Sequence, residues 1–234
     1  MKMTCSVCMV YFLCATIPLV RVGNSEDARR HAETIVWIDA HSGRATRSDT
    51  GEIVAVDLRH CWITDADLRR LAQLPQLNEL KLGHTKITDL GLDHLLPLQH
   101  VRTLDLRYAE NITDQGIAYL KDWQKLEHLN LRGTKVTSSV FEHLAKMRRL
   151  KSLDVGHSRV NDQQFEKLAH LSHLEHFAFG GNKMSGDALP LLKRLQALRN
   201  LNVGGQQRTD SGLWSVSVTD FNIEHLCQIE QLEM

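Results

Sequence analysis

The chain has 234 residues, and its 28 basic side chains balance its 28 acidic ones, so its formal charge is zero. This balance argues against a general nucleic-acid binder, which needs a basic excess to neutralise phosphates. Hydrophobic residues make up 42% and charged residues 24% of the chain, which is typical of a folded protein and excludes a disordered one. Leucine alone contributes 35 residues, and such an excess of one aliphatic residue points to internal repeats.

Residues 1–25 are predicted to be a signal peptide or an N-terminal anchor. Lys2 precedes an apolar run from Val7 to Val20, and Arg21 ends this run. The run is short for a membrane span and follows a positive residue, as in secretory leaders. We therefore expect an exported protein (periplasmic, cell-envelope or secreted), or a membrane-anchored one if the leader is not cleaved.

Residues 26–50 are predicted to form an N-terminal cap, with a short polar helix from Glu26 to about Thr34. A stack of repeats requires such a cap, because the first sheet edge and the first core layer are otherwise exposed to water.

From residue 53 to residue 203 the chain repeats one motif seven times. The motif is L-x-x-L-x-L, with Ile, Val or Phe allowed for Leu, and successive copies start 24 residues apart except for one interval of 25. Each copy is followed by an aliphatic residue, a Thr-Asp pair or a variant of it, and apolar residues at every third position. One unit therefore predicts a short strand, a tight turn and a helix whose N-cap is the Asp or a Ser in its place. Small hydrogen-bonding residues suited to the turn are Cys61, Thr85, Thr134, Ser158 and Asn182.

These units resemble leucine-rich repeats of the form L-x-x-L-x-L-x-x-T-x-I-T-D-x-G-L-x-x-L-x-x-L, which Leu77–His100 carries almost unaltered. This form is similar to the bacterial arrays common in planctomycetes and to the cysteine-containing repeats of F-box adaptors. The resemblance implies an α/β fold over residues 51–234: a right-handed leucine-rich repeat solenoid of about seven repeats. Its parallel β-sheet lies on the concave face and its helices on the convex face. It also implies a non-catalytic scaffold for protein–protein interaction.

The period breaks near the C-terminus. The aliphatic residue that should follow Val203 at the fifth position appears only at Val218. We expect about ten inserted residues around 204–214, although Thr209–Leu213 offers a competing register. The sequence shows no C-terminal cap, so the alternative function is a structural envelope module that self-associates through the exposed C-terminal edge.

Catalytic motifs such as G-x-S-x-G, H-E-x-x-H and the P-loop do not occur in the sequence. We therefore expect no enzyme activity, no cofactor and no metal. An enzyme would need chemistry from His60 and His84, which share one position in adjacent repeats, and from nearby carboxylates. His128 and His176 share another position, but a metal site needs three or four converging ligands. Cys61 and Cys227 lie about 30 Å apart in such a stack, too far for a disulfide.

The outward side chains of the concave sheet are the candidate binding residues. They carry mixed charge in the N-terminal two-thirds and are rich in Gly and Asn in the last third. Arg and Tyr are typical interface residues. The candidate set for a protein or peptide partner is Arg59, Glu79, Lys81, Asp105, Arg107, Tyr108, His128, Asn130, Arg132, Asp154 and His176. In the competing interpretation, charge pairing across strands only keeps an exposed sheet soluble.

Overall fold

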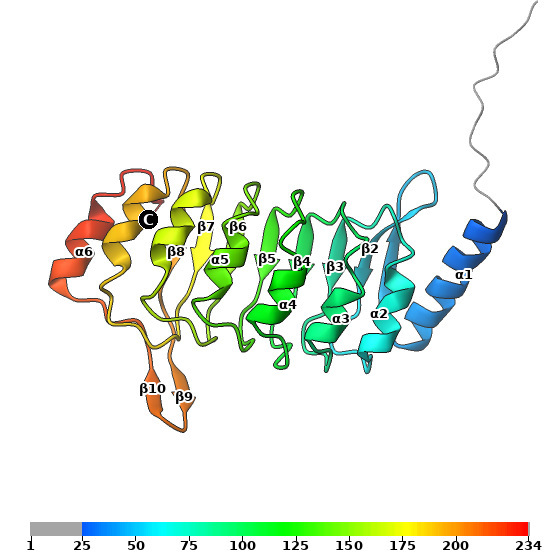
Figure 1. The fold of residues 1–234 in the computed structure, drawn as a ribbon, viewed down its shortest axis with the longest axis horizontal. Coiled ribbons are helices and arrows are strands. Elements are labelled where there is room, and N and C mark those ends of the chain that lie inside the picture. The colour runs from blue at the N-terminus through cyan, green and yellow to red at the C-terminus, as the bar shows by residue number, and fades with distance from the viewer. Residues whose placement is uncertain (1–24, 234) are drawn as a thin grey trace, which may run out of the picture.

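The computed structural model describes residues 25–233, so all of the predicted leader except Ser25 lies outside the described residues. The described chain forms one elongated stack, in which a row of helices lies in front of a row of strands (Figure 1). Strands β1 to β8 make a single sheet whose spatial order is their order in the chain. This is the α/β solenoid that the period of the leucine motif predicts.

The strands are short, and the repeat spacing sets their register. Strands β2 to β8 pair in parallel, with Leu80, Leu104 and Leu129 as partners in three successive strands. The one longer interval between motif copies leaves this register intact, because the extra residue lies in the turn after Tyr108. The strands of the sheet are β1 (Arg44–Arg47), β2 (Ile53–Asp57), β3 (Glu79–Lys81), β4 (Thr103–Asp105), β5 (His128–Asn130), β6 (Ser152–Asp154), β7 (His176–Ala178) and β8 (Asn200–Asn202).

The N-terminal end of the sheet is covered by a helix and an antiparallel strand. Helix α1 (Ser25–Ala40) runs beyond the segment 26–34 for which the sequence predicts a helix. Strand β1 then pairs antiparallel with β2 and so lies over its outer edge. Ile38 is fully buried and joins the core of the repeats.

Each repeat returns to the next strand through a single short helix, and these helices cover one face of the sheet. In the fifth and sixth repeats the turn tightens to a 3-10 helix. The helices are α2 (Asp65–Leu71), α3 (Asp89–Asp93), α4 (Asp114–Tyr119), α5 (Val140–Leu144), η1 (Phe165–His170), η2 (Leu189–Arg194) and α6 (Asp220–Cys227). Leucines of strand and helix meet between the two layers, where Leu80, Leu82, Leu92 and Leu95 are fully buried.

The helix caps differ from the sequence prediction. Thr88 and Thr113 are the N-cap residues, and each hydroxyl accepts the amide two residues on. The aspartate that follows reaches the next repeat instead. Asp89 accepts the amide and the hydroxyl of Thr113 at 2.8 and 2.6 Å. The same pair of bonds recurs at Asp65 and Asp114. These aspartates therefore join neighbouring repeats.

A hairpin occupies the stretch in which the period breaks. Strands β9 (Gln207–Thr209) and β10 (Gly212–Trp214) pair antiparallel and project away from the stack (Figure 1). The chain rejoins the stack at Val216, which bridges to Met184 of the preceding repeat. Helix α6 follows with Thr219 as its N-cap.

Candidate functional site

Two arginines of the candidate set bind the aspartate two residues before them. Arg59 Nε and Nη2 donate to the Asp57 carboxylate at 2.9 and 2.6 Å, and Arg107 Nε donates to Asp105 at 2.9 Å. The same carboxylates accept the backbone amides of these arginines at 3.1 and 3.0 Å. The hydrogen bond from Arg59 is the main reason that the pKa of Asp57 lies below its ordinary value.

The residue at the position of Asp57 and Asp105 closes the turn after the strand in several repeats. In five repeats its side-chain oxygen accepts the amide two residues further on, as in an Asx turn. The five residues are Asp57, Asp105, Asn130, Asp154 and Asn202. Asp105, Asn130 and Asp154 of the candidate set thus stabilise the strand ends whether or not a partner binds.

The other charged candidates also lie beside opposite charges. Lys81 Nζ is 2.5 Å from Glu79 Oε1, and Arg132 Nη1 is 3.7 Å from Asp154 Oδ2 of the next repeat. All four side chains remain partly exposed. The sheet face therefore presents alternating charge rather than a patch of one sign.

Two shallow clefts on the sheet bring most of the candidates together. A cleft of about 200 Å³ is lined by six of them, namely Lys81, Asp105, Arg107, His128, Asn130 and Asp154. A second cleft of about 340 Å³ adjoins it on the C-terminal side and is lined by His176. The two share Asn130, Ser152 and Asp154, and together we call them the sheet groove. Arg59, Glu79, Tyr108 and Arg132 do not line it.

Beside the sheet, one position has a left-handed backbone in successive repeats, and we call it the ring column. His60 and His84 stack with ring centroids 4.3 Å apart, and His84 and Tyr108 stack at 4.8 Å. The Tyr108 ring then covers Gly133, where a Cβ atom would lie 2.3 Å from it. The members of the column are His60, His84, Tyr108, Gly133, His157, Gly181 and Gly205. Sequence reasoning found the shared position of His60 and His84 but missed the column, because its members are His, Tyr and Gly, and residues other than Gly are uncommon at positive φ.

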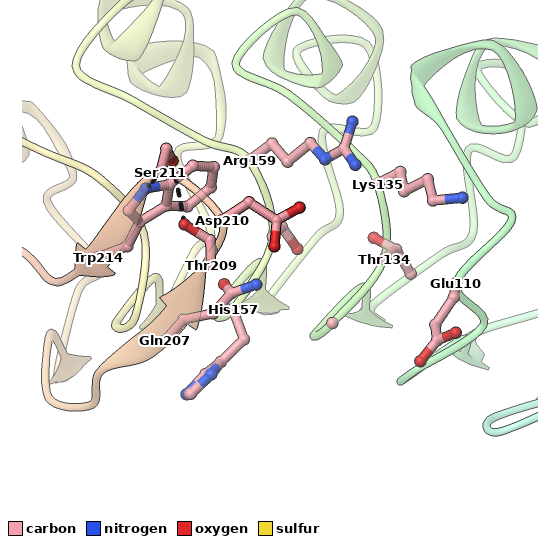
Figure 2. Close-up of a pocket in the computed structure, with 12 residues that line it drawn as sticks. Glu110, Thr134, Lys135, His157, Arg159, Gln207, Thr209, Asp210, Ser211 and Trp214 are labelled. Carbon is pink, nitrogen blue, oxygen red and sulfur yellow. Dashed lines mark hydrogen bonds between the residues drawn. The ribbon is translucent and has the colours of Figure 1, made fainter.

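Sequence reasoning also missed a cleft of about 480 Å³ between the hairpin and the turns beside it. Figure 2 shows Lys135, His157 and Arg159 on the repeats and Asp210 and Trp214 on the hairpin. We call it the hairpin cleft. Its only sequence signal is the break in the period, which says nothing of where the inserted residues fold back.

The comparisons with known proteins agree with this geometry. Residues 98–121 match a family model described as a leucine-rich repeat. Internalin C2 of Listeria monocytogenes aligns with a TM-score of 0.57 and 19% identity, over 88% of this chain and 91% of that one. The chain is a leucine-rich repeat protein. Comparison with curated proteins gives no match.

Two further solved structures share the fold of this chain. The leucine-rich repeat ectodomain of the Arabidopsis receptor kinase HAESA, in complex with an N-terminally extended IDA peptide hormone, aligns with a TM-score of 0.52 and 16% identity over 75% of this chain. The PEPR1–AtPEP1 complex aligns with a TM-score of 0.50 and 16% identity over 68%. This chain spans 37% and 22% of those two chains.

Within residues 25–233 of this leucine-rich repeat protein, no group of three or more His, Cys, Asp or Glu side chains could hold a metal ion. No helix in the same range is long and apolar enough to cross a membrane. Cys61 is a buried free thiol and Cys227 an exposed one. Burial raises the pKa of the Cys61 thiol, which makes it a poor nucleophile.

We expect His157 to make the stability of this leucine-rich repeat protein fall as the pH drops. Burial of the ring, and then Arg132, hold its pKa below the ordinary value of 6.5. The unfolded chain therefore binds this proton more readily, so the contribution of His157 is complete above about pH 6.5 and declines as the pH falls towards the folded pKa. His157→Asn keeps a residue that tolerates left-handed backbone. Urea unfolding at about pH 7.5 and 5.5 should show a smaller loss in this variant. An equal loss in both proteins would contradict the assignment.

Proposed function

We propose that this leucine-rich repeat protein is a non-catalytic scaffold that binds a protein or peptide in the sheet groove. The observation that carries the proposal is the continuity of that groove. Its lining residues run from Lys81 on β3 to Asn202 on β8, so an extended segment can lie across the strands. His128 and His176 are exposed along it and offer hydrogen-bonding groups to a partner.

Two further points support this proposal. Solenoids of this kind use their concave surfaces for binding, and the HAESA ectodomain was solved with a peptide hormone. The carboxylates of Asp105 and Asp154 already accept backbone amides, and Asp105 is only 4% exposed. Carboxylates committed in this way are poor acid–base catalysts, which favours binding over an enzyme activity.

The test is affinity capture from a cell-envelope extract of the source organism with the full chain as bait. Lys81→Glu with Arg132→Glu reverses two charges on the sheet face. We expect a partner retained by the wild type to bind this variant more than about tenfold more weakly. Charges at an interface fix how the two proteins align and speed their association, so reversing them opposes binding. Lys121→Glu with Lys146→Glu makes the same charge change at the ends of α4 and α5 and should retain the partner. Circular dichroism verifies that both variants fold. Unchanged capture by the Lys81/Arg132 variant would show that the sheet groove is the wrong site.

We also propose that the protein is exported. The apolar run from Val7 to Val20 follows Lys2, as in secretory leaders. The structurally similar HAESA domain is an ectodomain. Mass spectrometry of the N-terminus of the native protein tests this. An intact N-terminus on a protein found only in the cytosol would contradict it.

Self-association is the alternative function, and one observation favours it. Ile223 of α6 is 46% exposed, whereas Leu92 and Ile117, at the same position in earlier repeats, are fully buried. Phe221 beside it is 74% exposed. A second copy that covered this edge as the next repeat covers α3 would bury Ile223, whereas Leu90, at the position of Phe221 in the second repeat, is 64% exposed within the stack. Sedimentation over a wide concentration range tests the alternative, and a monomer throughout would exclude it.

A further inference from the structure

Basic side chains occupy one turn position in several repeats, directly after the buried turn residue. In the second repeat the basic residue, Lys86, lies 3.9 Å from Glu110. Lys135, Arg159 and Lys183 follow in the fourth, fifth and sixth repeats, and we call these three the basic column. Among the described residues, no carboxylate oxygen lies within 4.0 Å of their side-chain nitrogens.

The members of the basic column are held close together by the backbone. The amide of Lys135 donates to the Ile112 carbonyl at 2.9 Å, and the amide of Arg159 donates to Val136 at 2.9 Å. Successive turns are therefore adjacent, at about the 4.8 Å strand spacing. Three like charges at this spacing create a local positive potential on a chain whose net charge is zero.

The hairpin forms a fixed wall beside this column. With its nitrogen turned towards the repeats, the Gln207 side-chain amide donates to the carbonyls of His157 and Gly181 at 3.2 Å. Directly after β10 the chain is held by Met184, whose amide donates to Ser215 at 3.3 Å and whose carbonyl accepts from Ser217 at 3.0 Å. Both chain segments at the base of the hairpin are thus fixed to the repeats, which favours a preformed cleft over a loose loop.

Trp214 supplies an apolar surface next to the cations. Its Nε1 donates to Ser211 at 2.9 Å, so the polar atom of the ring is satisfied within the hairpin. Trp214 and Arg159 line the hairpin cleft and also an adjoining cleft of about 560 Å³, which contains Met184. The two clefts thus adjoin at Arg159 and Trp214, and their lining combines the basic column and the indole ring with the carboxylates of Glu110 and Asp162.

We propose that the hairpin cleft is a second binding site, which takes an acidic peptide segment that carries an aromatic or apolar residue. Carboxylates of the segment bind Lys135 and Arg159 through charge-assisted hydrogen bonds, and its apolar residue packs on Trp214. The ring column separates the hairpin cleft from the sheet groove, so the inference does not rest on the function proposed above. Asp210 of the hairpin and Glu110 of the repeats also line this cleft, and both carboxylates weaken the attraction for an anionic ligand (Figure 2).

The test uses two labelled nine-residue probes with capped ends, so that terminal charges play no part. The acidic probe alternates Glu and Ser around a central Phe, and the basic probe has Lys in place of Glu. Binding to the full chain is followed by fluorescence anisotropy at low and at physiological salt. We expect the acidic probe to bind, with an affinity that falls as salt rises, and the basic probe not to bind.

Three variants assign the binding to the cleft. Lys135→Gln with Arg159→Gln should weaken the acidic probe about tenfold, because hydrogen bonds between charged groups are the strong ones. Lys146→Gln with Arg149→Gln removes the same two charges outside the cleft and should leave binding unchanged. Asp210→Asn should tighten binding about twofold to threefold, the size of an exposed charge interaction.

The aromatic contact has its own control. Replacing Phe of the acidic probe by Ser should weaken binding to the wild type but not to Trp214→Ala. The proposal is overturned if the acidic probe does not bind, or if the Lys146/Arg149 control weakens it as much as the Lys135/Arg159 variant. Loss of binding in Lys81→Glu with Arg132→Glu, with the Lys135/Arg159 variant unaffected, would also overturn it and would place the probe in the sheet groove.

Discussion

Asn182→Ala is expected to lower the free energy of unfolding by about 3–5 kcal/mol, because it leaves several buried backbone groups without partners. The Asn182 side chain is fully buried in the turn of the sixth repeat. Its Nδ2 donates to the carbonyls of Val155 and Phe179 at 2.8 and 2.7 Å, and its Oδ1 accepts the Val160 amide at 3.2 Å. One side chain thus satisfies backbone groups of two adjacent repeats, and a methyl group replaces none of these bonds.

Urea unfolding followed by far-ultraviolet circular dichroism measures this cost. Lys183→Ala, one residue further on, is the control, since Lys183 is exposed and its loss should change stability by no more than about 0.5 kcal/mol. A loss below about 1 kcal/mol in Asn182→Ala would mean that water replaces the amide in the turn.

This turn position is a case in which the sequence predicts both the fold and the role of the residue. The motif spacing places Thr85, Thr134, Ser158 and Asn182 at equivalent turns, and their size and polarity suit them to backbone carbonyls. The structure confirms it: the hydroxyls of Thr85 and Thr134 donate to Leu82 and Leu131 at 2.6 and 2.7 Å. Such predictions succeed because the regular period fixes the position of each strand and turn in every repeat. The structure therefore does not depend on the conformational preference of any single residue.

The N-cap residues of the helices, by contrast, cannot be predicted from the repeat period. Thr88 and Asp89 are both good N-cap residues, so the sequence alone cannot say which of them caps the helix. The structure decides for Thr88, because the Asp89 carboxylate reaches Thr113 of the next repeat and accepts two hydrogen bonds there. The choice depends on the distance between neighbouring turns, which is a property of the stack and not of a single repeat.

The candidate site was less predictable than the fold for a similar reason. Alternation along the strands identifies which side chains point out of the sheet, and six of the eleven candidates do line one cleft. Whether Asp105 is free for a partner depends on its bond to Arg107, which composition does not reveal. The hairpin cleft is lined by both Trp214 and Lys135, which lie in distant parts of the sequence, and no period relates them.

Phe177→Ala is expected to lower the free energy of unfolding by about 3–5 kcal/mol, the usual cost of deleting a buried aromatic side chain. Phe177 is 2% exposed and stands where the other central strands carry Leu. Its ring lies 6.4 Å from that of Phe141, 6.0 Å from Phe165 and 4.8 Å from Phe179, so it belongs to an aromatic cluster that joins three repeats. Phe177→Leu restores the strand consensus and keeps part of the volume, and should cost less than about 1.5 kcal/mol.

The same variant tests how far stability is shared along the stack. Apart from the hairpin, the strands and helices of each repeat pack against those of its neighbours, so a cavity beneath β7 should loosen β6 to β8 before it affects β2 to β4. Amide hydrogen exchange of Phe177→Ala should therefore speed up at Leu153 and Leu201 and remain nearly unchanged at Leu80. Uniform acceleration across all strands would show instead that the solenoid unfolds as a single unit. In that case the aspartate and turn ladders between repeats couple them more strongly than the layered core does.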